Sequence, residues 1–194
     1  MKSNKMTTKD LITAGAFLAL YIVISLIPIF ALGFIPITFI LVPFIVPMIM
    51  GPIFSLYVAK VPRFGAVLIL GLIVGVLANS TGYIPGMALG AIIAIAAELV
   101  ARAGKYKSKK MYTISYMIFS LAYFTAFLML YFNREGYMAI TESLAGPDFV
   151  AVLETIIPSW LAYAQIALAL IGGFIGAKFG QKIMKKHFDN AEIV

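Results

Sequence analysis

Long uncharged stretches alternate with short polar gaps along the whole chain, and each stretch has the length of a membrane-spanning helix. A helix needs about 20 apolar residues to cross the hydrocarbon core of a bilayer, because each residue advances by about 1.5 Å. This length predicts six spans in one transmembrane domain, residues 1–194, and hence an all-α membrane bundle. The spans cover about residues 10–31, 36–59, 63–79, 83–102, 111–132 and 155–184.

Two of the predicted spans should be irregular. The second contains Pro43, Pro47 and Pro52, which lack backbone donors and should kink the helix. The third is short, and we expect it to be tilted or partly re-entrant. Residues 133–154 form the only substantial outer loop and hold half of the acidic residues.

Lysine and arginine residues favour one side of these spans. They gather at the two termini and in the gaps near residues 60 and 105, and only Arg134 falls in a gap of the opposite parity. Short loops rich in Lys and Arg stay in the cytoplasm. Both termini and these two gaps should therefore face the cytoplasm, and the gaps near residues 33, 81 and 140 should face outward.

Composition agrees with a lipid environment. Hydrophobic residues make up 62% of the chain and charged residues 12%, a balance too apolar for a soluble protein. The formal charge of +7 follows from the topology and favours anionic lipid headgroups, so we do not interpret it as a sign of nucleic-acid binding. The lipid bilayer is a predicted partner, and nucleic acid is not.

The sequence contains few groups that could perform catalysis. Cysteine is absent, which excludes disulfides and thiolate-bound metals. The lone histidine, His187, follows two lysines in the C-terminal tail and has no second ligand nearby. Neither a Gly-x-Ser-x-Gly elbow nor a Gly-x-x-x-x-Gly-Lys-Ser/Thr phosphate loop occurs. We therefore expect no enzyme activity, no catalytic residue, no metal and no cofactor.

Glu98 is the acidic residue that lies inside a predicted span. A carboxylate in lipid is costly, so such a residue is a functional candidate by default. Arg102 follows four residues later, in the order that favours an ion pair on a helix. We expect a structural pair of Glu98 and Arg102 near the cytoplasmic end, with coupling to a partner as the alternative.

Polar and aromatic residues recur at the outer ends of the spans. Trp and Tyr settle at the level of the lipid headgroups, so a belt of aromatic anchors is one interpretation. Amides near the apolar boundary need partners, and they either tie helices together or hydrogen-bond a ligand. A small-molecule pocket combines apolar walls with a few such polar groups. The candidate substrate-binding residues are Asn79, Tyr83, Asn133, Trp160, Tyr163 and Gln165.

Small residues recur at four-residue spacing on four spans. Such stripes let helix backbones approach closely in lipid, either inside one bundle or against a partner. They lie at Gly15/Ala19, Gly71/Gly75, Gly86/Gly90/Ala94 and Gly172/Gly176/Gly180. The first span is the better candidate for a partner face, because its cluster begins one turn inside the boundary marked by Lys9 and Asp10. The residues of that candidate docking face are Ala14, Gly15, Ala16 and Ala19.

The chain resembles the substrate-binding S component of an energy-coupling factor (ECF) transporter. The resemblance rests on six predicted spans in 194 residues, both ends inside, the cluster Thr13-Ala-Gly-Ala-Phe-Leu-Ala19, and the lack of a nucleotide site. Two basic-ended segments, Ala96–Tyr106 and Gly176–Phe188, are similar to the subgroup called Trep_Strep. Gly15 stands where alanine is more common in S components.

The resemblance implies capture of a vitamin-like or other micronutrient at an outward pocket, built from the outer loops and the outer halves of the last three spans. A transmembrane coupling subunit and two ATPase subunits would supply the energy, as in an ECF-type ABC importer of the prokaryotic plasma membrane. Docking would use the first span. The alternative is a non-transporting six-helix scaffold resembling the rod-shape protein MreD, with partner contacts but no ligand site.

Single cysteines test the predicted topology, because the chain has none of its own. Cysteines introduced near residues 106 and 188 should react with a membrane-impermeant thiol reagent only from the cytoplasmic side. A cysteine near residue 143 should react only from outside. Labelling of intact cells and inverted vesicles measures this, and the opposite sidedness at any of these positions would contradict the topology.

Overall fold

Helices are the only regular elements in the computed structural model, which describes residues 6–158 and 160–191, with side chains up to residue 185. α1 (Thr8–Gly33) leads through the short α2 (Pro36–Phe39) to α3 (Val42–Lys60). α4 (Ala66–Ala78) and α5 (Ile84–Ala103) follow. The remaining helices are α6 (Lys109–Ser120), α7 (Ala122–Thr125), α8 (Leu128–Phe132), α9 (Arg134–Ala145), α10 (Pro147–Ile156) and α11 (Leu161–Ala191).

These helices match the predicted membrane bundle in its main features. Four of them, α1, α3, α5 and α11 as far as Lys185, are long and apolar enough to cross a membrane. α4 is a shorter apolar helix. The chain is therefore an all-α membrane protein, while the number of six spans and the side that each end faces stay predictions.

The predicted fifth span is divided into α6, α7 and α8. At the first joint the Leu121 N–H donates to the carbonyl of Ile118, only three residues back, and the same pattern recurs at Phe124 and Phe127. Such bonds form tight 3₁₀ turns. The Ser120 hydroxyl also donates to backbone carbonyls here, which competes with regular helical bonding. The span is thus a broken helix.

The predicted outer loop is largely helical, because residues 133–154 fold mainly into α9 and α10. The last span begins at Leu161 and not near residue 155. Pro158 accounts for this difference, since a proline disfavours helical geometry in the residue before it, and Ile157 has φ −109° and ψ 89°.

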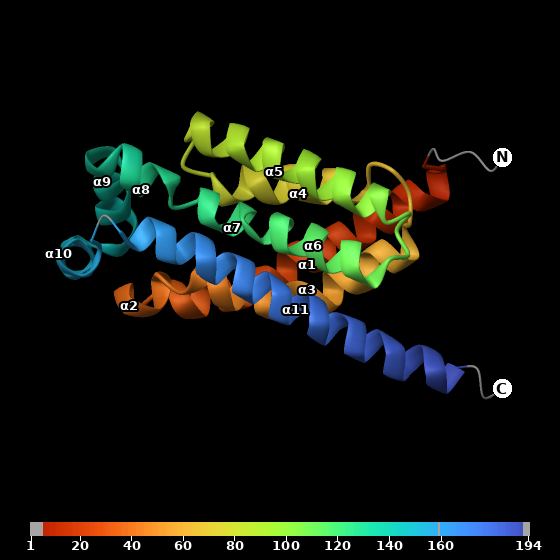
Figure 1. Cartoon of the computed structure of the whole chain (residues 1–194). Coiled ribbons are helices and arrows are strands. Elements are labelled where there is room, and N and C mark those ends of the chain that lie inside the picture. Colours follow the sequence, from red (N-terminus) through yellow and green to blue (C-terminus); the bar gives the residue numbers. More distant parts are fainter. Residues whose placement is uncertain (1–5, 159, 192–194) are drawn as a thin grey trace.

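The long helices are arranged around α6 and α7 (Figure 1). α4 and α5 pack against each other on one side, and α3 and α11 pack against each other on the other side. α1 lies against α3. α9 and α10 close one end of the bundle, whereas α1 begins and α11 leads away at the opposite end.

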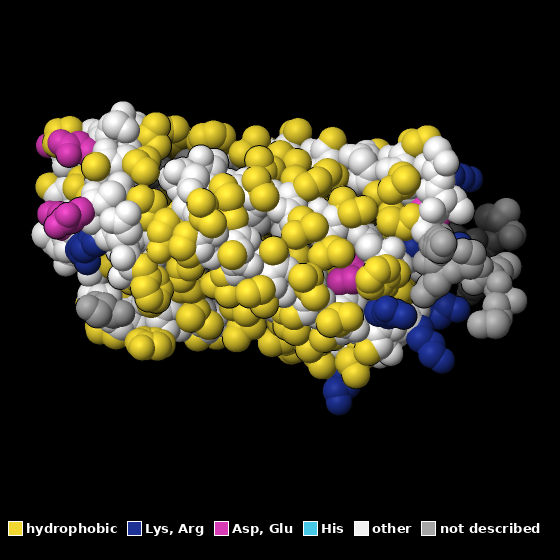
Figure 2. All heavy atoms as spheres, turned by 90° about the horizontal axis from the view of Figure 1, so that it is seen from above, with side chains coloured by type: hydrophobic (Ala, Val, Ile, Leu, Met, Phe, Trp, Pro, Cys, Tyr) yellow, Lys and Arg dark blue, Asp and Glu magenta, His cyan; other side chains and the backbone are white. Residues whose placement is uncertain are grey.

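The two ends of the bundle differ in charge. Figure 2 shows an apolar band along the molecule, with most of the visible Lys and Arg side chains at one end and most of the visible Asp and Glu at the other. We call the end where α1 begins the basic end, and the end that carries α9 and α10 the acidic end. The positive-inside pattern predicts that the basic end faces the cytoplasm.

Backbone contact between α3 and α11 holds the largest interface of the bundle. A Cβ atom at Gly51 would lie 2.1 Å from the carbonyl carbon of Gly176, and one at Gly172 would lie 2.2 Å from the carbonyl oxygen of Phe44. Only glycine fits at such separations. In lipid, where hydrophobicity does not drive helices together, this close approach supplies van der Waals contact.

Buried hydroxyl groups join further helices of the bundle. The Tyr116 hydroxyl on α6 donates to the Pro47 carbonyl of α3 at 2.7 Å, and the Tyr123 hydroxyl on α7 donates to that of Tyr21 on α1 at 2.9 Å. Among the described residues, no buried side-chain nitrogen or oxygen lacks a partner. This satisfaction is what a polar group inside a membrane requires.

Glu98 does not pair with Arg102, so the prediction of that ion pair is wrong. The Glu98 carboxylate is 1% exposed and accepts hydrogen bonds from the Leu68 N–H at 3.0 Å and from the Tyr106 hydroxyl. Leu68 lies in the first turn of α4, where free N–H groups attract a carboxylate. Arg102 stays at the surface with its guanidinium 5.0 Å from the centroid of the Phe64 ring. Burial, with the Glu98 hydrogen bond, raises the pKa of Tyr106, which therefore remains a donor.

A single methyl group tests the α3–α11 crossing. Gly176→Ala should lower stability by about 1 to 3 kcal/mol, because overpacking forces the backbone apart, and the new Cβ would lie 2.3 Å from the Pro47 carbonyl oxygen. Gly15→Ala is the matched control, since no atom lies within 4 Å of its Cβ position. Thermal unfolding in detergent compares the two, and equal stability would contradict the tight crossing.

Candidate functional site

A cavity of about 360 Å³ lies in the half of the bundle nearest the acidic end. α1 contributes one wall through residues 22–30, and α4 with its following turn contributes another. Phe39 and Val42, from the α2–α3 region, and Phe127 complete the apolar lining. Tyr137 of α9 closes it from the acidic end. The volume is within the range of small-molecule sites.

The lining is apolar and aromatic, with a few hydroxyl groups. The Phe39 and Phe127 rings stand with their centroids 4.9 Å apart. None of the lining side chains carries a charge, and the hydroxyls belong to Ser25, Ser80, Thr81, Tyr123 and Tyr137. Burial raises the pKa of Tyr137, so its hydroxyl stays neutral. Such a cavity suits an uncharged molecule with apolar or aromatic surface and a few hydrogen-bonding groups.

None of the six predicted substrate-binding residues lines this cavity. Asn79 comes nearest along the chain, because its neighbours Ala78 and Ser80 are part of the lining. Its own side chain is buried, and its amide nitrogen donates to the Gly75 carbonyl and the Thr125 hydroxyl, both at 2.9 Å. Asn79 therefore ties α4 to α7.

Gln165 is a second helix tie. Its amide nitrogen donates to the Ile40 carbonyl at 3.1 Å, and its amide oxygen accepts from the Tyr131 hydroxyl at 2.7 Å. The side chain is fully buried. Of the two interpretations open for the buried amides, the contacts favour helix ties over ligand groups for both Asn79 and Gln165.

The other four predicted residues lie outside the cavity, at helix ends or at the surface. Asn133 caps α9, with its side-chain oxygen accepting from the Gly136 N–H at 3.2 Å. Trp160 and Tyr163 are 64% and 78% exposed, as expected for aromatic anchors in the headgroup region. Tyr83 is half-buried against the core at the start of α5. The structure thus brings none of these four into the cavity.

Three hydroxyl-bearing residues of the cavity, Ser25, Tyr123 and Tyr137, were not predicted from the sequence. Ser25 and Tyr123 lie inside apolar spans. This position could have indicated a role for them, because a hydroxyl group in lipid needs a hydrogen-bonding partner. Ser25 donates to the Ile22 carbonyl at 2.8 Å. Tyr137 belongs to a segment that was expected to be a loop, so nothing in the sequence indicated that its side chain faces the cavity.

The candidate docking face on α1 is mostly uncovered. Gly15, Ala16 and Ala19 are exposed, and no atom lies within 4 Å of the Cβ position of Gly15. Ala14 is 3% exposed and packs inside the bundle, so it does not belong to the uncovered surface of α1. The reason is rotational, since successive residues of a helix are about 100° apart. We call Gly15, Ala16 and Ala19 the small-residue face.

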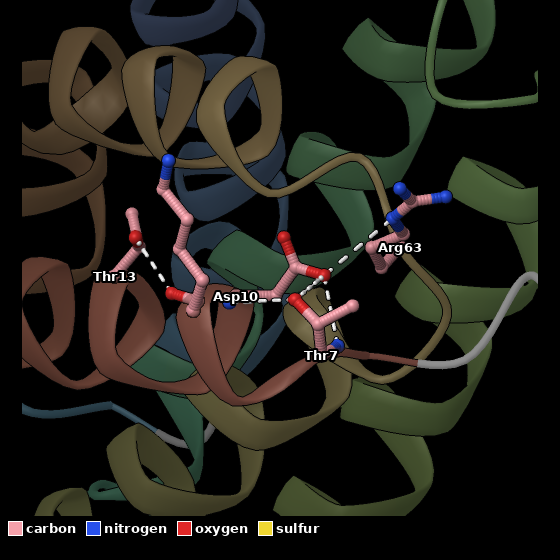
Figure 3. A network of polar contacts seen from close by, with 5 residues as sticks. Thr7, Asp10, Thr13 and Arg63 are labelled. Atoms are coloured by element: carbon pink, nitrogen blue, oxygen red, sulfur yellow. Dashed lines mark hydrogen bonds and ion pairs between the residues drawn. The ribbon is translucent and has the colours of Figure 1, made fainter.

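The start of α1 is fixed to the bundle just before this face (Figure 3). The Thr7 hydroxyl accepts from the Asp10 N–H at 3.2 Å, and the Asp10 carboxylate accepts from the Thr7 N–H at 2.9 Å, which together form a capping box. The same carboxylate lies 3.6 Å from the Arg63 guanidinium, between α3 and α4. The small-residue face is therefore presented by an anchored helix.

Comparison with known proteins supports the membrane assignment. A family model described as a hypothetical bacterial integral membrane protein (Trep_Strep) matches residues 8–190. That match runs from the first residue of α1 almost to the end of α11. No curated protein and no solved structure matches the chain.

The two buried amides should matter for stability in the absence of any ligand. Asn79→Ala and Gln165→Ala should each lower the free energy of unfolding by about 1 to 3 kcal/mol, because each leaves buried partner groups unpaired. Trp160→Ala and Tyr163→Ala are the exposed controls and should change it little. Thermal unfolding in detergent gives the comparison, and unchanged stability in both amide variants would make these amides available for a ligand instead.

Proposed function

The chain belongs to the Trep_Strep family of bacterial integral membrane proteins, and from this premise we propose that it is the substrate-capturing S component of an ECF-type ABC importer. It captures a vitamin-like or other micronutrient in the cavity near the acidic end. It then docks through α1 on a transmembrane coupling subunit that two separate ATPase subunits drive. The observation that carries this proposal is the uncovered small-residue face of α1.

The small-residue stripes of the other three spans are used within the bundle. Gly75 and Gly90 meet where α4 crosses α5, and Gly51 meets Gly176 where α3 crosses α11. Only the stripe on α1 points outward, with the exposed side chains of Ile12, Leu20 and Val23 on the same helix. In lipid, outward small residues permit close approach by another helix. A partner helix is therefore the natural occupant of this face.

The cavity supports the other half of the proposal, the capture of a small molecule. Its aromatic walls can stack on a ring, and its neutral hydroxyls can orient polar groups without selecting a charged cargo. A vitamin-like molecule with a neutral, ring-bearing body fits these properties. The chain carries no nucleotide-binding loop, so the energy for release is assigned to the ATPase subunits.

α1 connects the docking face with the cavity. From Gly15 to Ile29 in the cavity wall is about 21 Å along the helix at 1.5 Å per residue. Pro28 lies directly before Ile29; it lacks the N–H that would donate to the Ile24 carbonyl, which weakens the helix there. Contact of a partner with the small-residue face can thus move the α1 wall of the cavity, which offers a route from docking to release.

Bulk on the small-residue face should prevent docking. The double variant Gly15→Leu/Ala19→Leu should lower copurification of the coupling subunit and uptake by about tenfold or more, which requires a loss of only about 1.4 kcal/mol in binding. The matched control is Ala88→Leu/Ala167→Leu, at exposed positions of α5 and α11. Thermal unfolding checks that both variants fold. Normal assembly and uptake by the first double variant would rule out docking through this face.

Filling the cavity should prevent capture. Ala126→Trp places an indole in the cavity, and Ala139→Trp places the same group at an exposed position of α9 as the control. Mass spectrometry of small molecules released from the purified protein should find a compound in the wild type and the control but not in Ala126→Trp. Absence of any such compound from the wild type, together with stable partner copurification, would favour the MreD-like scaffold instead.

A further inference from the structure

A second hollow, a groove of about 410 Å³, runs along the seam between α6 and α11 at the basic end. Gln181 of α11 holds the seam together. Its amide nitrogen donates to the Lys109 carbonyl and to the Thr113 hydroxyl, both at 3.0 Å. The two helices are thereby fixed to each other, so the groove is formed in advance and does not need a ligand to open it.

The groove changes from charged to apolar along its length. Lys109 and Lys110 begin α6 at the basic end, and Met117 lies about 12 Å deeper at 1.5 Å per residue. On α11, the Lys178 ammonium lies 5.5 Å from the centroid of the Phe174 ring, one turn deeper. All three lysines are exposed, and no acidic side chain lines the groove. Its positive charge is therefore not neutralised by the lining.

We propose that this groove binds one anionic phospholipid. The phosphate lies among Lys109, Lys110 and Lys178, and an acyl chain lies along Ile114, Met117 and Phe174. Charge complementarity favours an anionic headgroup, because a choline headgroup would bring its ammonium beside three lysines. The basic end is predicted to face the cytoplasm, where the leaflet carries anionic lipids and each basic residue adds to their attraction.

Both halves of the groove are needed for this assignment. Inorganic phosphate would contact the lysines but would leave the apolar floor exposed, whereas a phospholipid covers both. General attraction of a basic protein surface to a negative membrane would depend on the number of lysines and not on their position. A specific site instead requires these three lysines, which gives the experiment its control.

The experiment is native mass spectrometry of the full chain in detergent with equimolar phosphatidylglycerol and phosphatidylcholine. The test variant is Lys109→Gln/Lys110→Gln/Lys178→Gln. The control is Lys60→Gln/Lys105→Gln/Lys182→Gln, which removes the same charge at exposed positions outside the groove. Each lysine should contribute about fivefold in affinity. The affinity of the test variant for phosphatidylglycerol should therefore fall on the order of 100-fold, while the control should keep the affinity of the wild type.

Each other outcome would overturn the proposal. Equal binding of phosphatidylcholine would remove the headgroup selectivity. Equal loss in the test and control variants would mean that only overall charge matters. Displacement of phosphatidylglycerol by inorganic phosphate at equal concentration would identify an anion site without a role for the acyl chain. Since all six lysines are exposed, circular dichroism should give the same helical content for wild type and both variants.

Discussion

The backbone contact of α3 with α11 is the constraint on which the rest of the structure depends. Glycines at 51, 172 and 176 let the two helices meet without intervening side chains, in a setting where apolar surface alone gives no preference for protein over lipid. The Tyr116 hydroxyl attaches α6 to the Pro47 carbonyl of the same pair. α1 then packs on α3 and completes the side of the bundle that the proposed partner contacts.

Polar groups inside the bundle set the division between structural and functional positions. Asn79, Gln165 and Glu98 are buried, and each is hydrogen-bonded to a neighbouring segment of the bundle, so these side chains serve packing. What stays available lies elsewhere: a neutral aromatic cavity near the acidic end, a small-residue face on α1, and a lysine-lined groove at the basic end. The proposed ligand, protein partner and lipid would thus use three separate regions of one bundle.

Much of the fold was predictable from the sequence, because the lengths of apolar stretches report membrane spans directly. The joints between α6, α7 and α8 could not be predicted, because residues 109–132 contain neither proline nor glycine. The 3₁₀ turns at these joints accompany tertiary hydrogen bonds, such as that from the Ser120 hydroxyl to the Ala169 carbonyl at 2.7 Å. The candidate site was harder for a rotational reason. Tyr163 and Gln165 are two residues apart, about 200° around the helix, so one faces out and the other in.

The central claim, that a partner helix occupies the uncovered face of α1, is tested most directly by a photoreactive amino acid placed at Ala16 in living cells. The same probe at Ile92, which is 62% exposed on α5, reports a surface in contact with lipid. Occupation of the face predicts a covalent adduct from position 16 with a membrane subunit that copurifies with ATPase subunits, and only lipid adducts from position 92. Lipid adducts alone from both positions would contradict the claim.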